Sequence, residues 1–435
     1  MVASSCTSCA RPGRPRRSVE FQSVNRRILL VLSFSHLATD LSQGAVPALL
    51  PVFKELFHLT YAGVGFVVLM ANVSSSVVQP AFGALSDRLR LQWMMPIGTL
   101  LAATGMTLAV FAPRYWVLVG LVLMSGLGVA AFHPEGYRFA GLAAGQRRAT
   151  GMAYFSAGGN IGFGFGPAVA ALALSVAGVR GMFYLIVFGV SAAALFWRSV
   201  PPGLRERLES EWVGPVSTAA PESAAKVPVR QNVVRVLALL VAFVAMRSWV
   251  SVGTSSFIPL YYTGIRHFDP RYGAMLVSLF LGAGAIGTLF GGMAADRFGR
   301  RTLLIFSTAI LPPLLLMLTR AGGLVPVIAA MVGGMAAVST FAVVMVMAQD
   351  LIPERIGMVS GLIIGLAVGM GGIGATMLGA IADRWGLATA MDVTAALPLA
   401  ALGIAFALPP DRLARRALRA GKAEAAPAGE TLDYR

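Results

Sequence analysis

The chain carries very little charge for its length. Only 12% of its 435 residues are Asp, Glu, Lys or Arg, whereas 57% are hydrophobic, and its mean hydropathy is +0.74. An average soluble domain has about 25% charged residues, which cover its surface. The composition therefore excludes a soluble globular protein and predicts a chain that lies within a bilayer.

Cysteine is almost absent. Cys6 and Cys9 form a single C-x-x-C in a leader rich in Pro and Arg, without a second pair or a nearby His. Because a structural zinc site needs four ligands, we predict an unstructured leader, no metal site and no cofactor. The leader also has no apolar stretch before Ile28, so we predict no cleaved signal peptide.

Acidic residues are scarce, and the 35 Lys and Arg outnumber them to give a net charge of +16. These cations do not form one soluble basic face, which argues against nucleic-acid binding. They concentrate in the leader, the tail and alternate loops between apolar segments, the positive-inside bias of membrane proteins. We therefore predict a multi-pass protein of the inner (cytoplasmic) membrane with both termini in the cytoplasm and the lipid bilayer as its partner.

Long apolar runs fill most of the chain. Each approaches or exceeds the roughly 20 residues that cross a bilayer as a helix, and each is too long for a strand. Six precede a polar linker and six follow it: 28–50, 61–85, 93–111, 116–132, 151–177, 182–197, 233–262, 272–295, 302–318, 324–348, 356–381 and 388–408. The pattern predicts an all-α integral membrane protein with twelve transmembrane helices in two pseudo-symmetric six-helix bundles.

The polar stretches divide the chain into five parts. The segment 199–232 is rich in Pro, Glu, Arg, Ser and Ala, a composition that cannot bury enough apolar area to pack. We predict a basic cytoplasmic leader at 1–27, an N-terminal bundle at 28–198, a cytoplasmic linker at 199–232, a C-terminal bundle at 233–408 and a cytoplasmic tail at 409–435.

One charged turn occurs in both halves, about half the chain apart, after the second apolar segment of each half. It resembles the major facilitator superfamily signature G-x-L-A-D-R-x-G-R-K, although the first copy has Arg90 where the second Gly is expected. The resemblance implies a secondary transporter whose halves rock around a central site, with this turn as a gate. The matching residues are Gly83, Asp87, Arg88, Gly292, Asp296, Arg297, Gly299, Arg300 and Arg301.

A second motif lies in the fifth apolar segment. Gly162, Gly166 and Pro167 predict a bend, because Pro removes a helical donor and Gly lets a neighbouring helix approach. A packed glycine face is the alternative. The motif resembles G-x-x-x-G-P of the superfamily's proton-coupled exporters, which favours export over uptake.

Two ionisable residues lie deep within apolar segments, where charge is costly and usually retained for function. Asp40 and Arg247 occupy equivalent depths in the first segment of each half. One interpretation is an ion pair that locks the halves together. The other is that Arg247 attracts an anionic substrate while Asp40 takes up and releases a proton.

Histidines accompany Asp40 as further proton-coupling candidates. His36 precedes Asp40 by four residues, which places both on one helix face. His133 and Glu135 flank Pro134, where we expect the fourth helix to break. A local ion pair between Glu135 and Arg138 is the alternative for that carboxylate.

Four short stretches resemble the fosmidomycin-resistance family of exporters: 33–40, Gln79-Pro80, His133-Pro134-Glu135 and Gly158-Gly159-Asn160. The resemblance implies exchange of fosmidomycin-like phosphonates or related small antibiotics for protons. The residues proposed to bind substrate are Arg247, Gln43, Asn160, Tyr154 and Trp249.

Three other functions remain as alternatives or are disfavoured. Proton-coupled uptake of an organic anion is the alternative within transport, and a non-transporting receptor or scaffold is the further one. An enzyme is disfavoured because the sequence contains neither a G-x-S-x-G turn nor metal-ligand spacing. We expect a monomer.

Overall fold

The computed structural model describes residues 25–89, 93–144, 148–200, 231–352 and 356–409. Every regular element in these ranges is a helix. Most of the predicted leader, linker and tail lies outside the described residues, and α1 begins at Arg26, within the predicted leader.

The described part of the first half contains eight α-helices and two short helical turns. Several predicted spans consist of more than one of these elements. They are α1 (Arg26–Gly44), α2 (Val46–Leu56), α3 (Tyr61–Asn72), the π-helical turn η1 (Val73–Val77), α4 (Gln79–Leu89), α5 (Met94–Ala109), α6 (Tyr115–Ala143), α7 (Arg148–Ala177), the 3-10 turn η2 (Gly178–Phe183) and α8 (Tyr184–Ser199).

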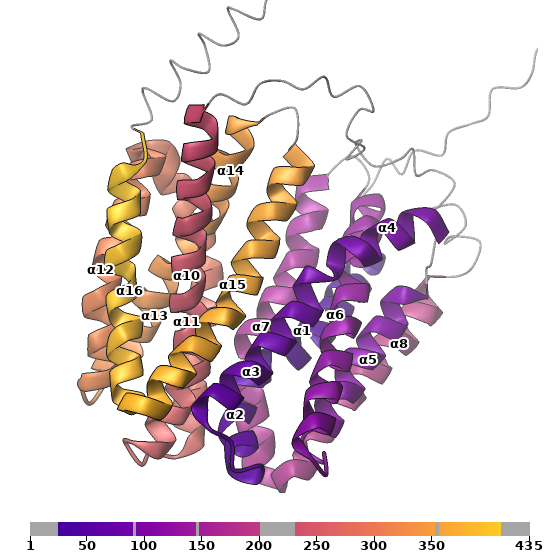
Figure 1. The fold of residues 1–435 in the computed structure, drawn as a ribbon. Helices are drawn as coiled ribbons and strands as arrows, with labels where there is room; N and C mark the ends of the chain where they lie inside the picture. Colours follow the sequence, from indigo (N-terminus) through magenta and orange to yellow (C-terminus); the bar gives the residue numbers. More distant parts are fainter. Residues whose placement is uncertain (1–24, 90–92, 145–147, 201–230, 353–355, 410–435) are drawn as a thin grey trace, which may run out of the picture.

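The described second half contains α10 (Gln231–Gly264), α11 (Pro270–Phe298), α12 (Arg300–Arg320), α13 (Val325–Ser339), α14 (Phe341–Leu351), α15 (Ile356–Trp385) and α16 (Leu387–Ala407). In Figure 1 the helices of the first half, indigo to magenta, gather on one side, and those of the second half, salmon to yellow, on the other. Eight helical stretches among the described residues are long and apolar enough to cross a membrane.

The fourth predicted span ends differently from our expectation. We expected Pro134 to break the helix, but α6 continues through Pro134 to Ala143. Proline removes one backbone donor at a cost of about 3 kcal/mol. Phe132 and Phe139, which flank Pro134, are 0% and 2% exposed, and their packing offsets that cost by holding both sides of α6 in place.

The two halves meet most extensively along two helix pairs, α3 with α15 and α7 with α11, and α2 also contacts α10. Between α7 and α11, the backbone N–H of Ala168 donates to Ser278 Oγ at 2.9 Å. Between α3 and α15, the Asp383 carboxylate accepts from the backbone N–H groups of Tyr61 at 2.6 Å and Ala62 at 2.8 Å. These hydrogen bonds join the first turn of α3 to the C-terminal end of α15, so the halves are closed against each other at that end.

Candidate functional site

Three titratable side chains converge in the first half. His36 Nε2 lies 3.2 Å from Asp40 Oδ2, and His133 Nε2 lies 3.4 Å from Asp40 Oδ1. The two Nε2 atoms are themselves 3.2 Å apart. The side chains of His36, Asp40 and His133 are 4%, 13% and 14% exposed, so α1 and α6 hold the cluster almost out of solvent.

Backbone carbonyls fix the tautomers of both histidines. His36 Nδ1 lies 2.9 Å from the Phe155 carbonyl oxygen, and His133 Nδ1 lies 2.8 Å from the Val129 carbonyl oxygen. A carbonyl only accepts, so both Nδ1 atoms carry hydrogen. In neutral rings both Nε2 atoms then present lone pairs to each other and to the carboxylate. A proton between these three acceptors relieves their repulsion and supplies the missing donor.

Helix α7 makes room for His36. A Cβ on Gly159 would overlap the His36 ring, so the absence of a side chain at that position lets α1 and α7 approach. On the same helix the Phe155 ring stacks on His36, with centroids 4.2 Å apart and an interplanar angle of 25°. The imidazole is therefore packed closely against α7, beside Gly159 and the Phe155 ring, which limits its rotation.

Tyr137 is a neighbour of the cluster that sequence reasoning missed. Its ring centroid lies 6.1 Å from that of His36 and 6.2 Å from that of His133. Its position, four residues after His133 on one helix, places both on the same face and was the available signal. Among the described residues its hydroxyl is a further titratable group beside the cluster.

Glu135 lies in a different set of contacts. Its side chain is fully buried and pairs with Arg138, whose Nη1 lies 3.3 Å from Glu135 Oε1. This is the local ion pair predicted from the sequence as the alternative to a role in proton coupling. Each of the two residues also has a further interaction beyond this pair.

The ligand atoms of His36, Asp40 and His133 all lie within 4.8 Å of one another. Two imidazoles with carbonyl-bound Nδ1 atoms and one carboxylate could also hold a divalent metal ion. We predicted no metal from the sequence, and an experiment on this cluster therefore needs a chelator control.

The proposed substrate-binding residues are dispersed. Gln43 donates to Ser75 Oγ at 2.9 Å, which links α1 to η1. Tyr154 and Asn160 are both exposed on α7. Trp249 lies against Gly374 of α15, and its buried indole N–H has no hydrogen-bond partner. The pocket that contains Arg247 is lined by none of these four side chains.

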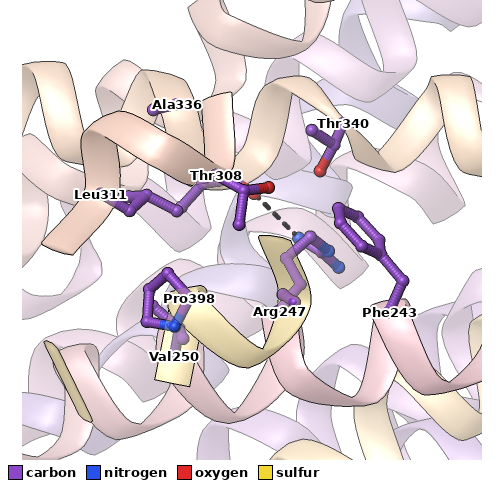
Figure 2. A pocket seen from close by; sticks show the side chains of 10 residues that line it. Phe243, Arg247, Val250, Thr308, Leu311, Ala336, Thr340 and Pro398 are labelled. Atoms are coloured by element: carbon purple, nitrogen blue, oxygen red, sulfur yellow. Dashed lines mark hydrogen bonds between the residues drawn. The ribbon is translucent and has the colours of Figure 1, made fainter. Parts of the chain in front are cut away.

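Arg247 does not pair with Asp40 in this structure. Its Nη1 donates to the Ala337 carbonyl oxygen at 3.3 Å, and its guanidinium carbon lies 5.2 Å from the Phe341 ring centroid. Figure 2 shows the side chain in a pocket formed by α10, α12, α13, α16 and Thr340. All of these elements belong to the second half, whereas Asp40 has its partners in the first.

A family model described as the Major Facilitator Superfamily matches residues 32–373. The chain belongs to the major facilitator superfamily. YfnC of Bacillus subtilis, an uncharacterized MFS-type transporter, is 33% identical over 389 residues, covering 89% of this chain and 94% of that protein. The Fosmidomycin resistance protein of Escherichia coli is 29% identical over 388 residues, covering 88% and 93%.

Solved structures of superfamily members share this fold. The nucleoside transporter NupG aligns with a TM-score of 0.72 at 14% identity, covering 88% of this chain and 99% of that one. A bacterial homologue of the human lysosomal transporter Spinster, inward-facing and occupied, aligns at 0.69 with 13% identity, covering 89% and 96%. At such identities the likeness shows the fold alone. The family and these neighbours are transporters rather than enzymes.

The second copy of the superfamily turn joins α11 to α12. Gly299 has a φ of 97°, a left-handed conformation that favours glycine. Arg300 pairs with Asp350 at the end of α14, and Arg301 donates to the Ala405 and Phe406 carbonyl oxygens of α16. The two arginines thus fasten the turn to neighbouring helices, while Asp296 and Arg297 are exposed and Gly292 has open space beside it.

The first copy is described only in part. Gly83 lies in α4. A Cβ at this position would lie 3.9 Å from the Cβ of Pro134 in α6, which is an ordinary van der Waals contact. The side chains of Asp87 and Arg88 lie outside the described residues, so their predicted gate role stays a prediction.

The glycine motif of α7 packs against α1. A Cβ on Gly162 would overlap the Leu37 carbonyl, and one on Gly166 would meet Gly44 at 2.6 Å. Helix α7 passes through Pro167 without interruption. These contacts agree with the packed-face interpretation, which is compatible with a role in export.

Proposed function

We propose that this superfamily member is a proton-coupled secondary transporter that exports a small anionic, antibiotic-like molecule of the fosmidomycin type. The observation that supports it most directly is the cluster of His36, Asp40 and His133. It lies within helices α1 and α6, has little solvent contact and has fixed tautomers. Such an arrangement binds a proton between three acceptors and releases it when an acceptor moves.

The proposed coupling uses helix movement to change proton affinity. His36 and Asp40 share α1, whereas His133 is carried by α6. A small displacement of α6 relative to α1 would separate His133 from the other two and weaken the shared site. Glu135, paired with Arg138, is a further proposed participant because it is a fully buried carboxylate on the same helix as His133.

The substrate proposal starts from the printed name of a relative, Fosmidomycin resistance protein. We propose that the exported molecule is anionic, since Arg247 is a partly buried cation whose contacts include no carboxylate among the described residues. Gln43, Asn160, Tyr154 and Trp249 are the proposed polar and aromatic contacts to the rest of the molecule.

We further propose that the chain has twelve spans in two six-helix bundles, with both termini cytoplasmic. Rocking of the two bundles would expose the central site alternately to the two sides of the membrane. The hydrogen bonds from the first turn of α3 to the Asp383 carboxylate support closure of the two halves at one end. The turn at Gly299 to Arg301 lies at the opposite ends of α11 and α12 and is the proposed cytoplasmic gate. In that orientation the end held by Asp383 faces the outside, and we propose that substrate enters from the cytoplasm.

The test is substrate-driven proton movement in proteoliposomes that contain a pH-sensitive dye. Adding fosmidomycin on one side should shift the internal pH of vesicles that carry the wild-type protein, and Asp40→Asn should abolish that shift. Ser35→Ala is the matched control, because its buried hydroxyl bonds only to the Val31 carbonyl of its own helix. A chelator in all buffers excludes a metal effect.

Two results would contradict the proposal. If the Asp40→Asn variant moved protons at the wild-type rate, the cluster of His36, Asp40 and His133 would have no role in coupling. No proton-coupled flux of fosmidomycin or of a panel of small anionic antibiotics would refute the transport proposal itself. The direction of flux under an imposed gradient separates export from uptake.

A further inference from the structure

The donor atoms of His36, Asp40 and His133 are spaced like the ligands of a metal ion. The two Nε2 atoms lie 3.2 Å apart, His36 Nε2 lies 3.2 Å from Asp40 Oδ2, and His133 Nε2 lies 3.4 Å from Asp40 Oδ1. A tetrahedral Zn²⁺ ion with bonds of about 2.0–2.1 Å holds neighbouring ligand atoms about 3.3 to 3.4 Å apart. Helices α1 and α6 therefore need little movement to hold such an ion.

The protein also keeps both imidazoles in the tautomer that binds metal. Nδ1 of each ring donates to a backbone carbonyl oxygen, that of Phe155 for His36 and that of Val129 for His133. Each neutral ring then has its lone pair on Nε2, the atom that lies next to the Asp40 carboxylate. A hydrogen bond to the other ring nitrogen is the usual second shell of a metal-binding histidine, because it orients the ring and raises its basicity.

The Asp40 carboxylate is available as the third ligand. Its Oδ1 atom is inaccessible to solvent and accepts no hydrogen bond, and among the described residues no Lys or Arg forms an ion pair with it. An ion among these donors needs no separate cavity, because metal–ligand bonds are shorter than van der Waals contacts. The side chains of Asp40 and His133 are 13% and 14% exposed, which leaves a path for the ion and a side for water as a further ligand.

We propose that His36, Asp40 and His133 bind a divalent transition-metal ion of the Zn²⁺ type. Two imidazoles and a carboxylate suit Zn²⁺ and Co²⁺, whereas Mg²⁺ and Ca²⁺ take oxygen ligands. The ion joins α1 to α6, the two helices whose separation is proposed to release the proton, so Zn²⁺ should inhibit substrate-driven proton movement. That inhibition rests on the proposed function, but metal binding does not.

Titration of the purified, chelator-treated protein with Co²⁺ tests the site. Co²⁺ replaces Zn²⁺ in such sites, and its visible absorption is far more intense at low coordination number than in water. Cys6 and Cys9 are first replaced by Ser, and the protein carries no histidine tag, because thiolates and added imidazoles also bind metal. Stoichiometric Co²⁺ should produce the intense spectrum, Zn²⁺ should displace it, and Mg²⁺ should not.

Variants at His133 locate the bound ion. His133→Gln should weaken the apparent affinity for Co²⁺ by about 100-fold or more, because losing a ligand costs at least as much as losing a second-shell contact. His133→Cys replaces one metal ligand with another, so it should retain the ion and add a thiolate-to-cobalt absorption band. The matched control is the double variant His58→Asn, His267→Asn, which removes the other two histidines of the chain. Both are exposed and have positive φ angles, which Asn tolerates, so this variant should bind Co²⁺ as the wild type does.

Two results would overturn the metal site. A wild-type protein that gives only the spectrum of aqueous Co²⁺ would mean that the cluster binds a proton alone. Equal affinities for Co²⁺ in the wild type and His133→Gln would mean that the ion binds elsewhere. The titration needs neither substrate nor a pH gradient, so Zn²⁺ that binds and leaves proton movement unchanged would support the metal site while contradicting the coupling role.

Discussion

Replacing Asp383 with Ala should open the closed end of the transporter. In the structure this carboxylate accepts two backbone N–H groups from the first turn of α3, at 2.6 and 2.8 Å, where the helix dipole also favours negative charge. Asp383 is exposed, so solvent screens part of the interaction. We estimate a loss of about 1–2 kcal/mol, which changes the closed-to-open ratio by roughly 5- to 30-fold.

The assay is a distance measurement between spin labels at Glu55 and Thr389, which are exposed on the two halves near this end. Cys6 and Cys9 are the only native cysteines and are first replaced by Ser. Asp383→Ala should shift the distance distribution towards longer values, and Asp383→Asn, which keeps one acceptor oxygen, should shift it less.

Asp392→Ala is the control, since this exposed carboxylate pairs with Arg320 within the second half alone. It should leave the distances unchanged. A distribution for Asp383→Ala that superimposes on the wild type would refute the view that this contact holds the two halves together.

Three further predictions concern single positions. Gly159→Ala should displace the His36 ring and reduce substrate-driven proton movement at least tenfold without loss of expression; wild-type coupling would contradict the packing argument. Gly299→Ala, at a φ of 97°, should lower the free energy of unfolding by about 1–2 kcal/mol, measured by denaturation; unchanged stability would show that the turn relaxes. The hydrogen bond from the Arg271 backbone N–H lowers the pKa of Asp269, so its capping stabilisation is present above the unfolded pKa of about 3.9 and lost as pH falls through the folded value. Asp269→Asn should remove that acid dependence from the thermal unfolding curve, and an unaltered curve would contradict it.

Much of the proposed site could be anticipated from local spacing. His36 and Asp40 are four residues apart, so any helix brings them together. The turn at Gly299 was recognisable because glycine and basic residues recur there at a fixed spacing. A third Asp-Arg pair, Asp383-Arg384, was overlooked even though Gly379 and Gly386 flank it at the spacing of the second copy.

Other contacts could not be predicted because they depend on helices distant in sequence. His133 reaches Asp40 only because α6 packs beside α1. Sequence spacing alone did not show whether Asp40 and Arg247 form an ion pair between the halves or act separately on a proton and a substrate. The structure gives each residue partners within its own half of the chain.

The sequence by itself determined that this is a helical membrane protein with one charged turn in each half, because low charge, long apolar runs and a repeated turn are local properties of the chain. Only the tertiary structure decided which ionisable groups meet. Helix packing selects one rotational setting from many, and it placed His133 beside Asp40, Asp383 at the first turn of α3, and Arg247 beside Thr340.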